Sequence, residues 1–541
     1  MGRKSVVILA AAAMSTAALA GCSSSGSTSS SSSGGSSGSG SSAPAVLTIG
    51  TPAIPPSIDQ ITDGTTAYNT VTNFSAGLLQ FTPLAADATQ LDSPADVTGD
   101  LASAYQVTPQ GIVLTLRAAK AANGDVLTPQ DVQWTFQRAV ALKDGVAGFY
   151  MSIAGINPAD PVTILGAHQV RINGKITPLG LLPLAEYNFS IIDSTLAKQH
   201  ATSADPWAAQ WLATHTANFA AYGVADFTPN SEVILTSNPN YWAGKPAWSR
   251  VVLTATSSQS MAELVKSGAI GYAFQVPLAQ FKQFEQDSSL KTLQSPSLDQ
   301  DVLRLNPNSG PFANADVRRA VSMAIDRAAL VEGPYQTVGK PAISPITTAI
   351  PLTSGTSQYY TYNLAAAKAL LAQTPYKSGF SFTLDVTQAE VSPVDVNSLA
   401  LNLQSQLSKL GVKVTVDTVA NDADFVAAEN AHKYSAWLEQ EGAAAADAAF
   451  VFSLNYVSTG VANFGQINIA AINSAVATAS PLAIGSARTA AMDKAIAAFN
   501  SAMPEIPLVQ TSVTYAFAKY VCGQGTSAYQ LVLPASLKPC S

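Results

Sequence analysis

Apolar residues recur along this chain at two spacings, and segments with one spacing alternate with segments with the other. Ile112, Leu114 and Leu116 occupy every second position, which predicts a strand, and the apolar run 46–50 predicts another. Between such runs the apolar positions are three or four residues apart, as in amphipathic helices. Alternation of short strands and helices indicates an α/β fold with more than one sheet.

Three segments carry the helical spacing most clearly. One begins at Thr128-Pro129, a capping residue followed by a proline that the first helical position accepts. Another follows Asn314, and the third ends at Gly411, just before an alternating strand at 412–416. The expected buried stripes are Val132, Thr135, Phe136, Ala139 and Val140; then Val317, Ala320, Val321, Ala324, Ile325 and Ala328; then Val396, Leu399, Ala400, Leu403, Leu407 and Leu410. In the second helix, Arg318, Arg319, Ser322 and Asp326 are expected to face solvent.

The N-terminus differs from the rest of the chain. Arg3 and Lys4 precede an apolar, Ala-rich stretch at 6–19 that is typical of a secretory signal. Residues 19–22, Leu-Ala-Gly-Cys, resemble the lipobox of bacterial lipoproteins, in which the cysteine receives a diacylglyceryl group. The following Ser/Gly stretch predicts a flexible tether. We expect a signal peptide at 1–21 and lipidation at Cys22 with a tether over 22–45; an ordinary signal with a chance cysteine, or a core helix, is the alternative.

Composition excludes several classes of protein. Of 541 residues, 12% are charged and 47% hydrophobic, and the formal net charge is −7. A nucleic-acid binder would need a basic face, and a disordered chain would contain fewer apolar residues. After the N-terminus no apolar run reaches the length of about 18 residues that a transmembrane helix needs. The body is therefore expected to be globular, with about three to four domains or subdomains by length.

The reactive side chains indicate neither catalysis nor metal binding. The four histidines are scattered, and the G-x-S-x-G pattern at 34–38 lies within the tether, where no strained strand-to-helix turn is expected. Cys522 and Cys540 are expected to form a disulfide in an exported protein, with two free or buried thiols as the alternative. We expect no metal, no cofactor and no enzymatic activity.

Five segments follow one another in an order that is recognisable as a whole. They are Asn-Gly-Asp-Val-Leu-Thr-Pro-Gln-Asp-Val at 123–132 with Phe136 and Arg138, Asn-Pro-Asn-Tyr-Trp-Ala-Gly-Lys-Pro at 238–246, the run 303–306, the run 311–327, and the helix-like segment 362–371. Together they resemble the extracellular solute-binding proteins of family 5, the peptide- and nickel-binding lipoprotein receptors of ABC importers. The turn at 238–242 is expected to direct the chain, and Asp326-Arg327 to lie on a solvated helix face.

The resemblance implies the two-lobed periplasmic-binding-protein fold, type II, with an extra subdomain in lobe one. By that resemblance, lobe one covers 46–300, with the subdomain at about 71–180, and lobe two covers 301–505. The segment 506–541 would return to lobe one. Crossing strands would join the lobes, and the ligand would be enclosed between them.

The resemblance also implies a ligand site, from which this chain departs. Peptide-binding members pair the ligand's α-ammonium with the Asp of a G-W-x-x-D stretch, and the counterpart at 436–441 places Gln440 at the Asp position. A buried Gln does not neutralise an ammonium. Either Glu439 or Glu441 takes that part after a one-residue shift, or the ligand is not a conventional free peptide. The alternative is that Glu439, Gln440 and Glu441 are simply polar residues at a strand end and contact no ligand.

Five further residues are candidates by the same resemblance. Trp437 would stack on a ligand or pack in lobe two, and Asn306 would offer an amide to the ligand or cap a turn. Asn463 and Phe464 belong to a segment similar to one near the family's cleft mouth. Tyr222 aligns with the Tyr of the family's G-T-G-P-Y turn, which is otherwise lost here. The low charge of the body predicts a cleft of backbone groups, amides and aromatics without ion pairs.

These expectations lead to one function and one alternative. The chain is expected to be a lipid-anchored, extracytoplasmic and monomeric substrate-binding protein that delivers a peptide or similar small polar solute to the permease and ATPase subunits of an ABC importer. The alternative is a non-transport envelope lipoprotein that uses the same fold as a regulator or scaffold in cell-wall or lipid assembly. A secreted hydrolase would need a nucleophile or metal constellation, which the sequence does not offer.

Overall fold

The computed structural model describes most of the body of the chain. The described residues are 45–59, 68–81, 85, 88, 90–91, 96–142, 145–185, 189–350, 361–387, 394–442, 445–523 and 533–540. The predicted signal peptide, the lipidation site Cys22 and the tether up to residue 44 lie outside them. Among the described residues, no helix is both long enough and apolar enough to cross a membrane.

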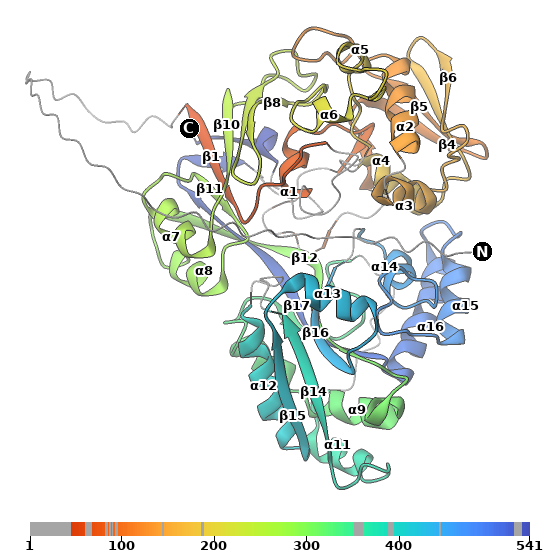
Figure 1. Ribbon diagram of the computed structural model, residues 1–541, viewed down its shortest axis with the longest axis vertical. Helices are drawn as coiled ribbons and strands as arrows, with labels where there is room; N and C mark the ends of the chain where they lie inside the picture. The colour runs from red at the N-terminus through yellow and green to blue at the C-terminus, as the bar shows by residue number, and fades with distance from the viewer. Residues whose placement is uncertain are drawn as a thin grey trace, which may run out of the picture.

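One large mixed sheet runs through the whole molecule (Figure 1). Its 11 strands follow the order β15-β14-β16-β12-β17-β11-β1-β10-β9-β8, with β13 paired to β17 beside this path. The strands are β1 (Val46–Thr51), β8 (Tyr222–Thr228), β9 (Glu232–Ser237), β10 (Arg250–Ala255), β11 (Tyr272–Phe274), β12 (Leu290–Leu305), β13 (Lys340–Pro341), β14 (Phe380–Thr387), β15 (Val412–Val419), β16 (Ala436–Glu441) and β17 (Glu505–Ala518).

Strands β12 and β17 belong to both lobes. They pair antiparallel from Leu290 opposite Ala518 to Arg304 opposite Glu505. The last part of β12 also pairs with β16, whereas the last part of β17 pairs with β11. The register shifts between Pro296 and Gln300, near the middle of this ribbon, and such irregularities bend a strand pair. The two lobes are therefore joined by a continuous pair of strands (Figure 1).

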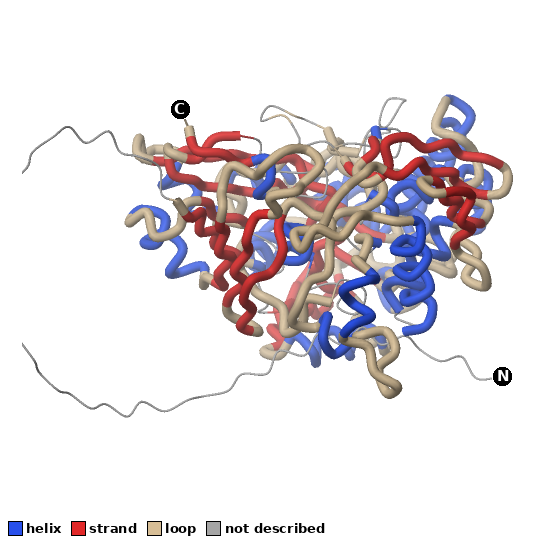
Figure 2. Tube along the Cα trace, turned by 90° about the horizontal axis from the view of Figure 1, so that it is seen from above, coloured by secondary structure: helices blue, strands red, loops and turns tan. Residues whose placement is uncertain are grey.

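Lobe one holds the strands from β1 to β11 and a second sheet with the order β4-β5-β7-β6. Seen from above, strands run from one end of the molecule into its middle, and a separate group of strands lies at the other end (Figure 2). The remaining strands of this lobe are β2 (Leu79–Gln80), β3 (Thr98–Gly99), β4 (Ala102–Thr108), β5 (Gly111–Leu116), β6 (Val162–Gly166) and β7 (Gln169–Asn173). Its helices are α1 (Tyr68–Val71), α2 (Pro129–Leu142), α3 (Gly145–Ala154), α4 (Leu182–Ala185), α5 (Ser194–Gln199), α6 (Ala209–Leu212), α7 (Ser258–Lys266) and α8 (Leu278–Phe284).

Lobe two is built on β14, β15 and β16 together with the ends of β12 and β17 that meet at Arg304 and Glu505. β14 pairs in parallel with both β15 and β16. Its helices are α9 (Ala315–Ala324), α10 (Arg327–Glu332), α11 (Leu364–Leu371), α12 (Val396–Ser408), α13 (Asp422–Asn430), α14 (Ala448–Asn455), α15 (Ala470–Ala479) and α16 (Ser486–Ala502). The predicted lobe boundaries at 300/301 and 505/506 fall within β12 and at the start of β17, and they stay predictions.

After β17 the chain forms a small hairpin. Strands β18 (Val521–Gly523) and β19 (Leu537–Pro539) pair antiparallel. The disulfide between Cys522 and Cys540 closes this hairpin, which confirms the predicted pairing. The Lys291 ammonium lies 3.4 Å from the sulfur of Cys522 and 3.2 Å from that of Cys540.

Several local predictions are confirmed. The runs 46–50 and 112–116 lie in β1 and β5, and α2 begins at Pro129, where Asp131 accepts hydrogen bonds from the backbone and hydroxyl of Thr128. Helix α12 is followed by Gly411 at a positive φ of 88° and then by β15, as expected. The 238–242 turn directs the chain: the Asn238 amide donates to the carbonyls of Lys120 and Ala220.

The helix predicted from Asn314 to Ala328 is confirmed up to Ala324 and is wrong beyond it, where Ala328, expected to be buried, is exposed. Ile325 adopts an extended conformation, and Asp326 caps a separate helix, α10. Arg318 and Ser322, expected to face solvent, are buried, and Arg318 donates to the carbonyls of Phe312, Ala502 and Met503. The solvated face expected at Asp326-Arg327 is wrong as well, because Arg327 is buried and donates to the Pro507 carbonyl.

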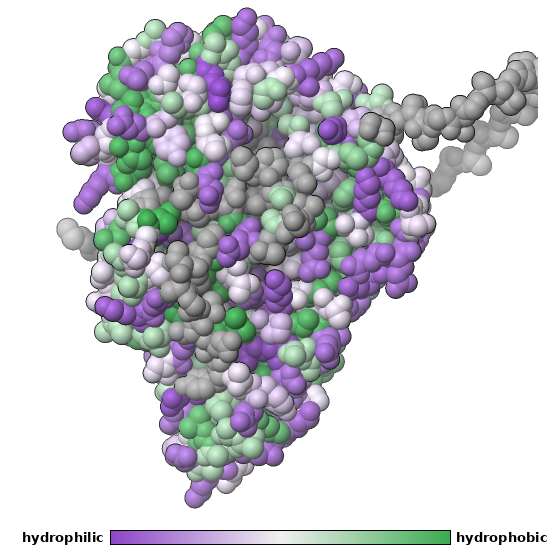
Figure 3. All heavy atoms as spheres, turned by 180° about the vertical axis from the view of Figure 1, so that it is seen from behind, coloured by the Kyte–Doolittle hydropathy of each residue, from purple (hydrophilic) through white to green (hydrophobic). Residues whose placement is uncertain are grey.

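The surface is mixed in character. From behind, hydrophilic residues are spread over both lobes, with hydrophobic ones in small groups between them (Figure 3). The large apolar side chains that are most exposed lie on separate elements, and scattered exposure of this kind is normal for soluble proteins. They include Val107, Val126, Leu401 and Val461.

Candidate functional site

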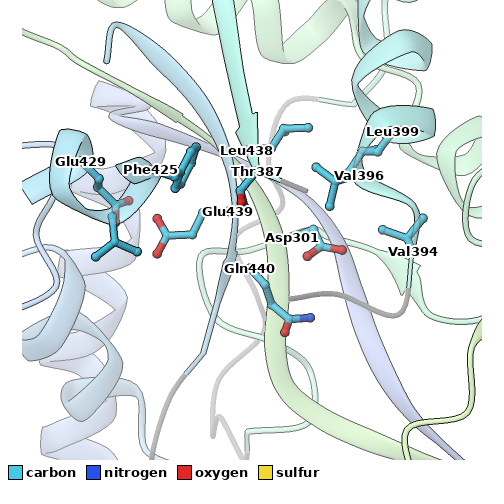
Figure 4. A pocket seen from close by; sticks show the side chains of 11 residues that line it. Asp301, Thr387, Val394, Val396, Leu399, Phe425, Glu429, Leu438, Glu439 and Gln440 are labelled. Carbon is cyan, nitrogen blue, oxygen red and sulfur yellow. The ribbon is translucent and has the colours of Figure 1, made fainter. Parts of the chain in front are cut away.

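A cavity of about 240 Å³ opens where β14 and β16 end in lobe two (Figure 4). Its lining residues come from β12, β14, β16, helix α13 and the start of α12. They are Asp301, Thr387, Val394, Val396, Leu399, Phe425, Val426, Glu429, Leu438, Glu439 and Gln440. In open α/β sheets the carboxyl ends of parallel strands are where ligands bind, so the place of this cavity in the fold is that of a ligand site.

Local sequence sets the walls of the cavity. Asp395 accepts from the amide of Asn397 and so starts α12, which presents Val396 and Leu399. Asn421 caps α13 in the same way. On the sheet side, β16 lies antiparallel to β12 with Gln440 opposite Asp301. Apolar side chains from two helices therefore cover a strand end that carries polar groups.

The ionisable residues that line the cavity are all acidic: Asp301, Glu429 and Glu439. The buried Tyr335 hydroxyl donates a hydrogen bond to Asp301. A cleft without ion pairs was expected from the low charge of the body. That expectation does not describe this cavity, because its acids connect to a buried ion-pair network.

Arg304 is the centre of that network. The residue is 1% exposed, and its Nε lies 2.5 Å from Glu439 Oε2 and 3.5 Å from Glu505 Oε2. A terminal nitrogen of the same guanidinium lies 3.8 Å from Glu441 Oε2. Burial opposes the charged form of Arg304, yet the surrounding carboxylates raise its pKa above the usual value. Arg304 therefore stays cationic and holds several carboxyl groups around it.

Glu429 and Glu439 form a carboxyl pair at the cavity wall. The indole Nε1 of Trp437 donates to Glu429 Oε1 at 2.8 Å and lies 3.4 Å from Glu439 Oε2. Burial, and then the charge of Glu439 and a hydrogen bond to it, raise the pKa of Glu429 to about 9. At neutral pH Glu429 is thus protonated, and its partner Glu439 lies in ion-pair contact with Arg304.

Glu441 and Glu505 form a second pair behind the first. The Tyr456 hydroxyl lies 2.6 Å from Glu441 Oε1 and 3.1 Å from Glu505 Oε1. Burial and the neighbouring Glu505 raise the pKa of Glu441 well above its usual range. Burial raises the pKa of Glu505 as well, although Arg304 and the hydrogen bond from Glu441 oppose this. Both carboxyl pairs therefore lie around the Arg304 guanidinium.

The structure brings four of the predicted site residues to this region. Glu439 and Gln440 line the cavity. Trp437 is buried and does not belong to the lining; it packs in lobe two and orients both members of the first carboxyl pair. Glu441 is buried as well and contacts Arg304 from behind.

The other four predicted residues do not line the cavity. Asn306 accepts from the backbone of Asn308 and so caps the turn after β12. The Asn463 amide group bonds within its own loop, to Val457 and Ile467, and the Phe464 ring lies against the Arg304 guanidinium. Tyr222 is fully buried in lobe one and donates to the Trp248 carbonyl, because the edge strand β8 turns its side chain into the core.

Sequence reasoning missed the residues that organise the site. Arg304 interrupts the apolar run Val302-Leu303-Arg304-Leu305, and a charge buried in such a run requires charged partners, so the sequence contains a signal for a buried ion pair at this position. No comparable pattern indicates that Glu429 or Asp301 belongs to a site. Across the described part of the chain, no three His, Cys, Asp or Glu side chains are grouped so as to hold a metal ion.

A two-lobed α/β molecule with paired crossing strands and a cavity at strand ends belongs to the class of solute-binding proteins. The sequence assigns the chain to one family within this class, because residues 96–463 match the bacterial extracellular solute-binding proteins, family 5. The chain is a member of that family, as the resemblance predicted.

Curated relatives and solved structures agree with this assignment. The probable D,D-dipeptide-binding periplasmic protein DdpA of Escherichia coli K12 is 28% identical over 331 residues, which are 60% of this chain and 62% of that protein. The match thus spans less than two thirds of that relative. HbpA2 from Haemophilus parasuis has a TM-score of 0.77 at 20% identity, over 92% of this chain and 100% of that one. A dipeptide-binding protein from Pseudoalteromonas sp. SM9913, solved with Met-Leu, has a TM-score of 0.75 at 18% identity, over 92% and 100%. These likenesses confirm the predicted fold.

Proposed function

We propose that this protein is the substrate-binding component of an ABC importer for a peptide or a similar small polar solute. The observation that carries the proposal is the cavity at the ends of β14 and β16, beside the two strands that cross between the lobes. Membership in family 5 and the peptide-binding relatives support it. The ligand would be captured between the lobes and presented to the permease, with the ATPase driving import.

Within the site we propose that Glu439 and Gln440 contact the ligand, since both line the cavity. Trp437 and Glu441 would position Glu439 through the hydrogen bonds and ion pairs around Arg304. The lobes would divide at 300/301 and 505/506, so that bending of β12 and β17 opens and closes the site. The function requires no catalytic step and no cofactor.

We also propose that the protein works outside the cytoplasmic membrane as a monomer anchored by a lipid at Cys22. The lipobox-like residues 19–22 support the anchor. The Cys22→Ala variant should leave the membrane fraction when cells are fractionated, whereas wild type should stay with it. Equal distribution of the two forms would contradict the anchor but not the binding function.

Native mass spectrometry of the protein as purified tests the binding function. We expect a mass increment whose fragments are those of a peptide, and a rise in melting temperature with pools of di- to pentapeptides. Gln440→Ala should reduce both, and Gln106→Ala, an exposed glutamine on β4, should change neither. A protein that is always empty and shows no thermal shift with peptides or polar metabolites would refute import and favour the envelope scaffold.

A further inference from the structure

We propose that Gln300 and Gln510 form a hydrogen-bond switch in the two strands that cross between the lobes. In the arrangement described above, each amide is bonded at one end to a neighbouring segment. In a second arrangement of the lobes, the Gln510 amide donates to the Gln300 side-chain oxygen. The inference rests on the proposed opening and closing of the lobes, and it adds the two side chains that set the balance between the arrangements.

The two glutamines lie opposite one another where the β12–β17 ribbon is irregular. The register shifts between Pro296 and Gln300 and again between Asp301 and Val302, so the Gln300–Gln510 pair lies between two irregularities. Directly opposed residues of an antiparallel pair point to the same face with Cβ atoms about 4.5–5.5 Å apart, which is within reach of two glutamine amides. A change in the bend of the ribbon therefore changes the distance between these amides.

Each amide has one paired and one unpaired end. Gln300 Nε2 donates to the Pro345 carbonyl at 3.0 Å, and Gln510 Oε1 accepts from the backbone amide and the hydroxyl of Thr348 at 3.2 and 2.8 Å. These partners determine which atom of each amide is the nitrogen, because a carbonyl only accepts and a backbone N–H only donates. Gln300 Oε1 and Gln510 Nε2 have no hydrogen-bond partner among the described residues, and both atoms are buried.

The two unpaired ends are an acceptor and a donor, so each can satisfy the other. A buried polar atom without a partner is unfavourable, and one amide–amide hydrogen bond would remove that cost for both atoms. In the present arrangement the bond is not formed although the residues are opposed, because the irregular ribbon holds the two ends apart. A second bend that brings them together gains this bond.

The segment 340–350, which we call the strap, holds the ribbon in its present bend. It begins with β13, which pairs with β17, and its Thr347 hydroxyl donates to the Ser297 carbonyl in the irregular part of β12. Near its end, the Ala349 carbonyl accepts from the backbone amide of Leu91 in lobe one at 2.7 Å. The strap thus contacts both crossing strands and lobe one. Its bonds to the two glutamines favour the arrangement in which their other ends stay unpaired.

The glutamine pair lies next to the cavity. Asp301 follows Gln300 and lines the cavity, and Glu441, opposite Gln300 on β16, contacts Arg304. A change of bend at Gln300 therefore moves one wall of the cavity. A ligand that fits one position of this wall better than the other shifts the balance between the two arrangements.

The distance between the lobes reports the two arrangements. Spin labels at Gln106→Cys in lobe one and Lys368→Cys in lobe two, both at exposed positions, give this distance by pulsed electron paramagnetic resonance. The full chain carries Cys22→Ala, so that the labels react with the two introduced cysteines. The measured quantity is the ratio of the second arrangement to the present one.

A double-mutant cycle on this ratio tests the proposal. The ratio is measured for the wild-type pair, for Gln300→Met, for Gln510→Met and for the double variant. Each single variant loses its own bond to the strap as well as the bond between the glutamines, and the strap contributions cancel in the cycle. We expect a coupling of about tenfold in favour of the second arrangement, as one net amide hydrogen bond between buried groups supplies.

Gln294 and Ser512 provide the matched control. They are hydrogen-bonded across the same two strands at 3.0 Å, in the part of the ribbon where the register is regular. A cycle with Gln294→Met and Ser512→Ala should show no coupling in the ratio. Gln300→Asn and Gln510→Asn, which shorten each side chain by one carbon, replace a methionine variant that does not fold.

Two kinds of failure are distinguishable. A coupling factor near one or below it overturns the inference, and this is the result if a bound water bridges the two amide ends in both arrangements. The lobes would then still show two populations. A single distance in the wild type and in every variant, also with the pools of di- to pentapeptides present, refutes the opening and closing of the lobes itself.

Discussion

Replacement of Arg304 by methionine tests whether buried charge holds lobe two together. Arg304 is 1% exposed, and its guanidinium contacts carboxylates from β16 and β17, with Glu439 at 2.5 Å and Glu505 at 3.5 Å. Methionine fills part of the volume but brings no charge. The variant leaves Glu505 buried and Glu439, whose side chain is 20% exposed, partly buried without their cation, and removing one partner of a buried ion pair is strongly destabilising.

The magnitude follows from how the variant can respond. A carboxylate that loses its cation in a buried site takes up a proton. For a Glu whose pKa in the unfolded state is near 4.3, this protonation lowers the free energy of unfolding by about 4 kcal/mol at pH 7 and by about 1 kcal/mol at pH 5. One such protonation agrees with the roughly 3–5 kcal/mol measured when one partner of a buried pair is removed. We expect a loss of about 3–5 kcal/mol at pH 7 and of about 1–2 kcal/mol at pH 5.

The sign of the pH effect is fixed by the pKa change. Arg304 lowers the pKa of Glu505, which burial raises, so in the variant the folded-state pKa of Glu505 would lie further above the unfolded value. Stability is then greatest near pH 4 and is lost as the pH rises from there to pH 7. Urea unfolding followed by tryptophan fluorescence at pH 5 and pH 7 measures both numbers. Arg319→Met is the control, since the Arg319–Asp316 pair has side chains 30% and 39% exposed and should contribute about 1 kcal/mol or less at either pH.

Two results would refute this reasoning. A loss below about 1 kcal/mol at pH 7 would mean that the carboxyls around Arg304 are already neutral in the wild-type protein. An equal loss at pH 5 and pH 7 would mean that methionine disturbs packing and that charge is not the cause.

Three further predictions concern stability elsewhere. Burial raises the pKa of Asp100 to about 7, so the stability of the wild-type protein should fall as the pH rises from about 4 to 7. Asp100→Asn keeps an acceptor for the Trp242 indole and should lessen that fall in urea titrations. An unchanged dependence of stability on pH would contradict this prediction. Replacing Cys522 and Cys540 by serine opens a loop of 18 residues and should lower the unfolding free energy by about 3 kcal/mol; a loss under 1 kcal/mol would mean that the loop is ordered without the bond. Asn314→Ala removes the acceptor for two amides at the start of α9 and should cost about 1 kcal/mol, which Asn314→Asp should restore.

Local patterns predicted the elements whose cause is local. Thr128-Pro129 begins α2 and Gly411 ends the α12 segment because a cap or a glycine determines the backbone there. The break at Ile325 has no such signal: the apolar spacing continues through it, and the helix stops because Asp326 caps α10 and Arg327 reaches Pro507 on β17. That contact joins residues 180 positions apart, so no window of the sequence contains it.

The site shows the same limit. The family motif led to 439–441, but alternation along a strand does not tell which side chains face a cavity. Glu439 and Gln440 both line it, although they point to opposite faces of β16, because the cavity lies at the strand end. No sequence pattern predicts Glu429 as a site residue, because its contacts with Trp437 and Glu439 form only when α13 packs against β16 in the folded chain.

The strand β17 has a consequence for how the protein is made. It lies at 505–518, yet it pairs with β11 in one lobe and with β12 along its whole length. A chain delivered from its N-terminus thus cannot complete the sheet of either lobe until almost all of it has emerged. Contacts of such long sequence separation make folding slow and late. Truncation before residue 505 should therefore yield no folded half-molecule. During synthesis the sheets of both lobes stay incomplete until β17 has emerged.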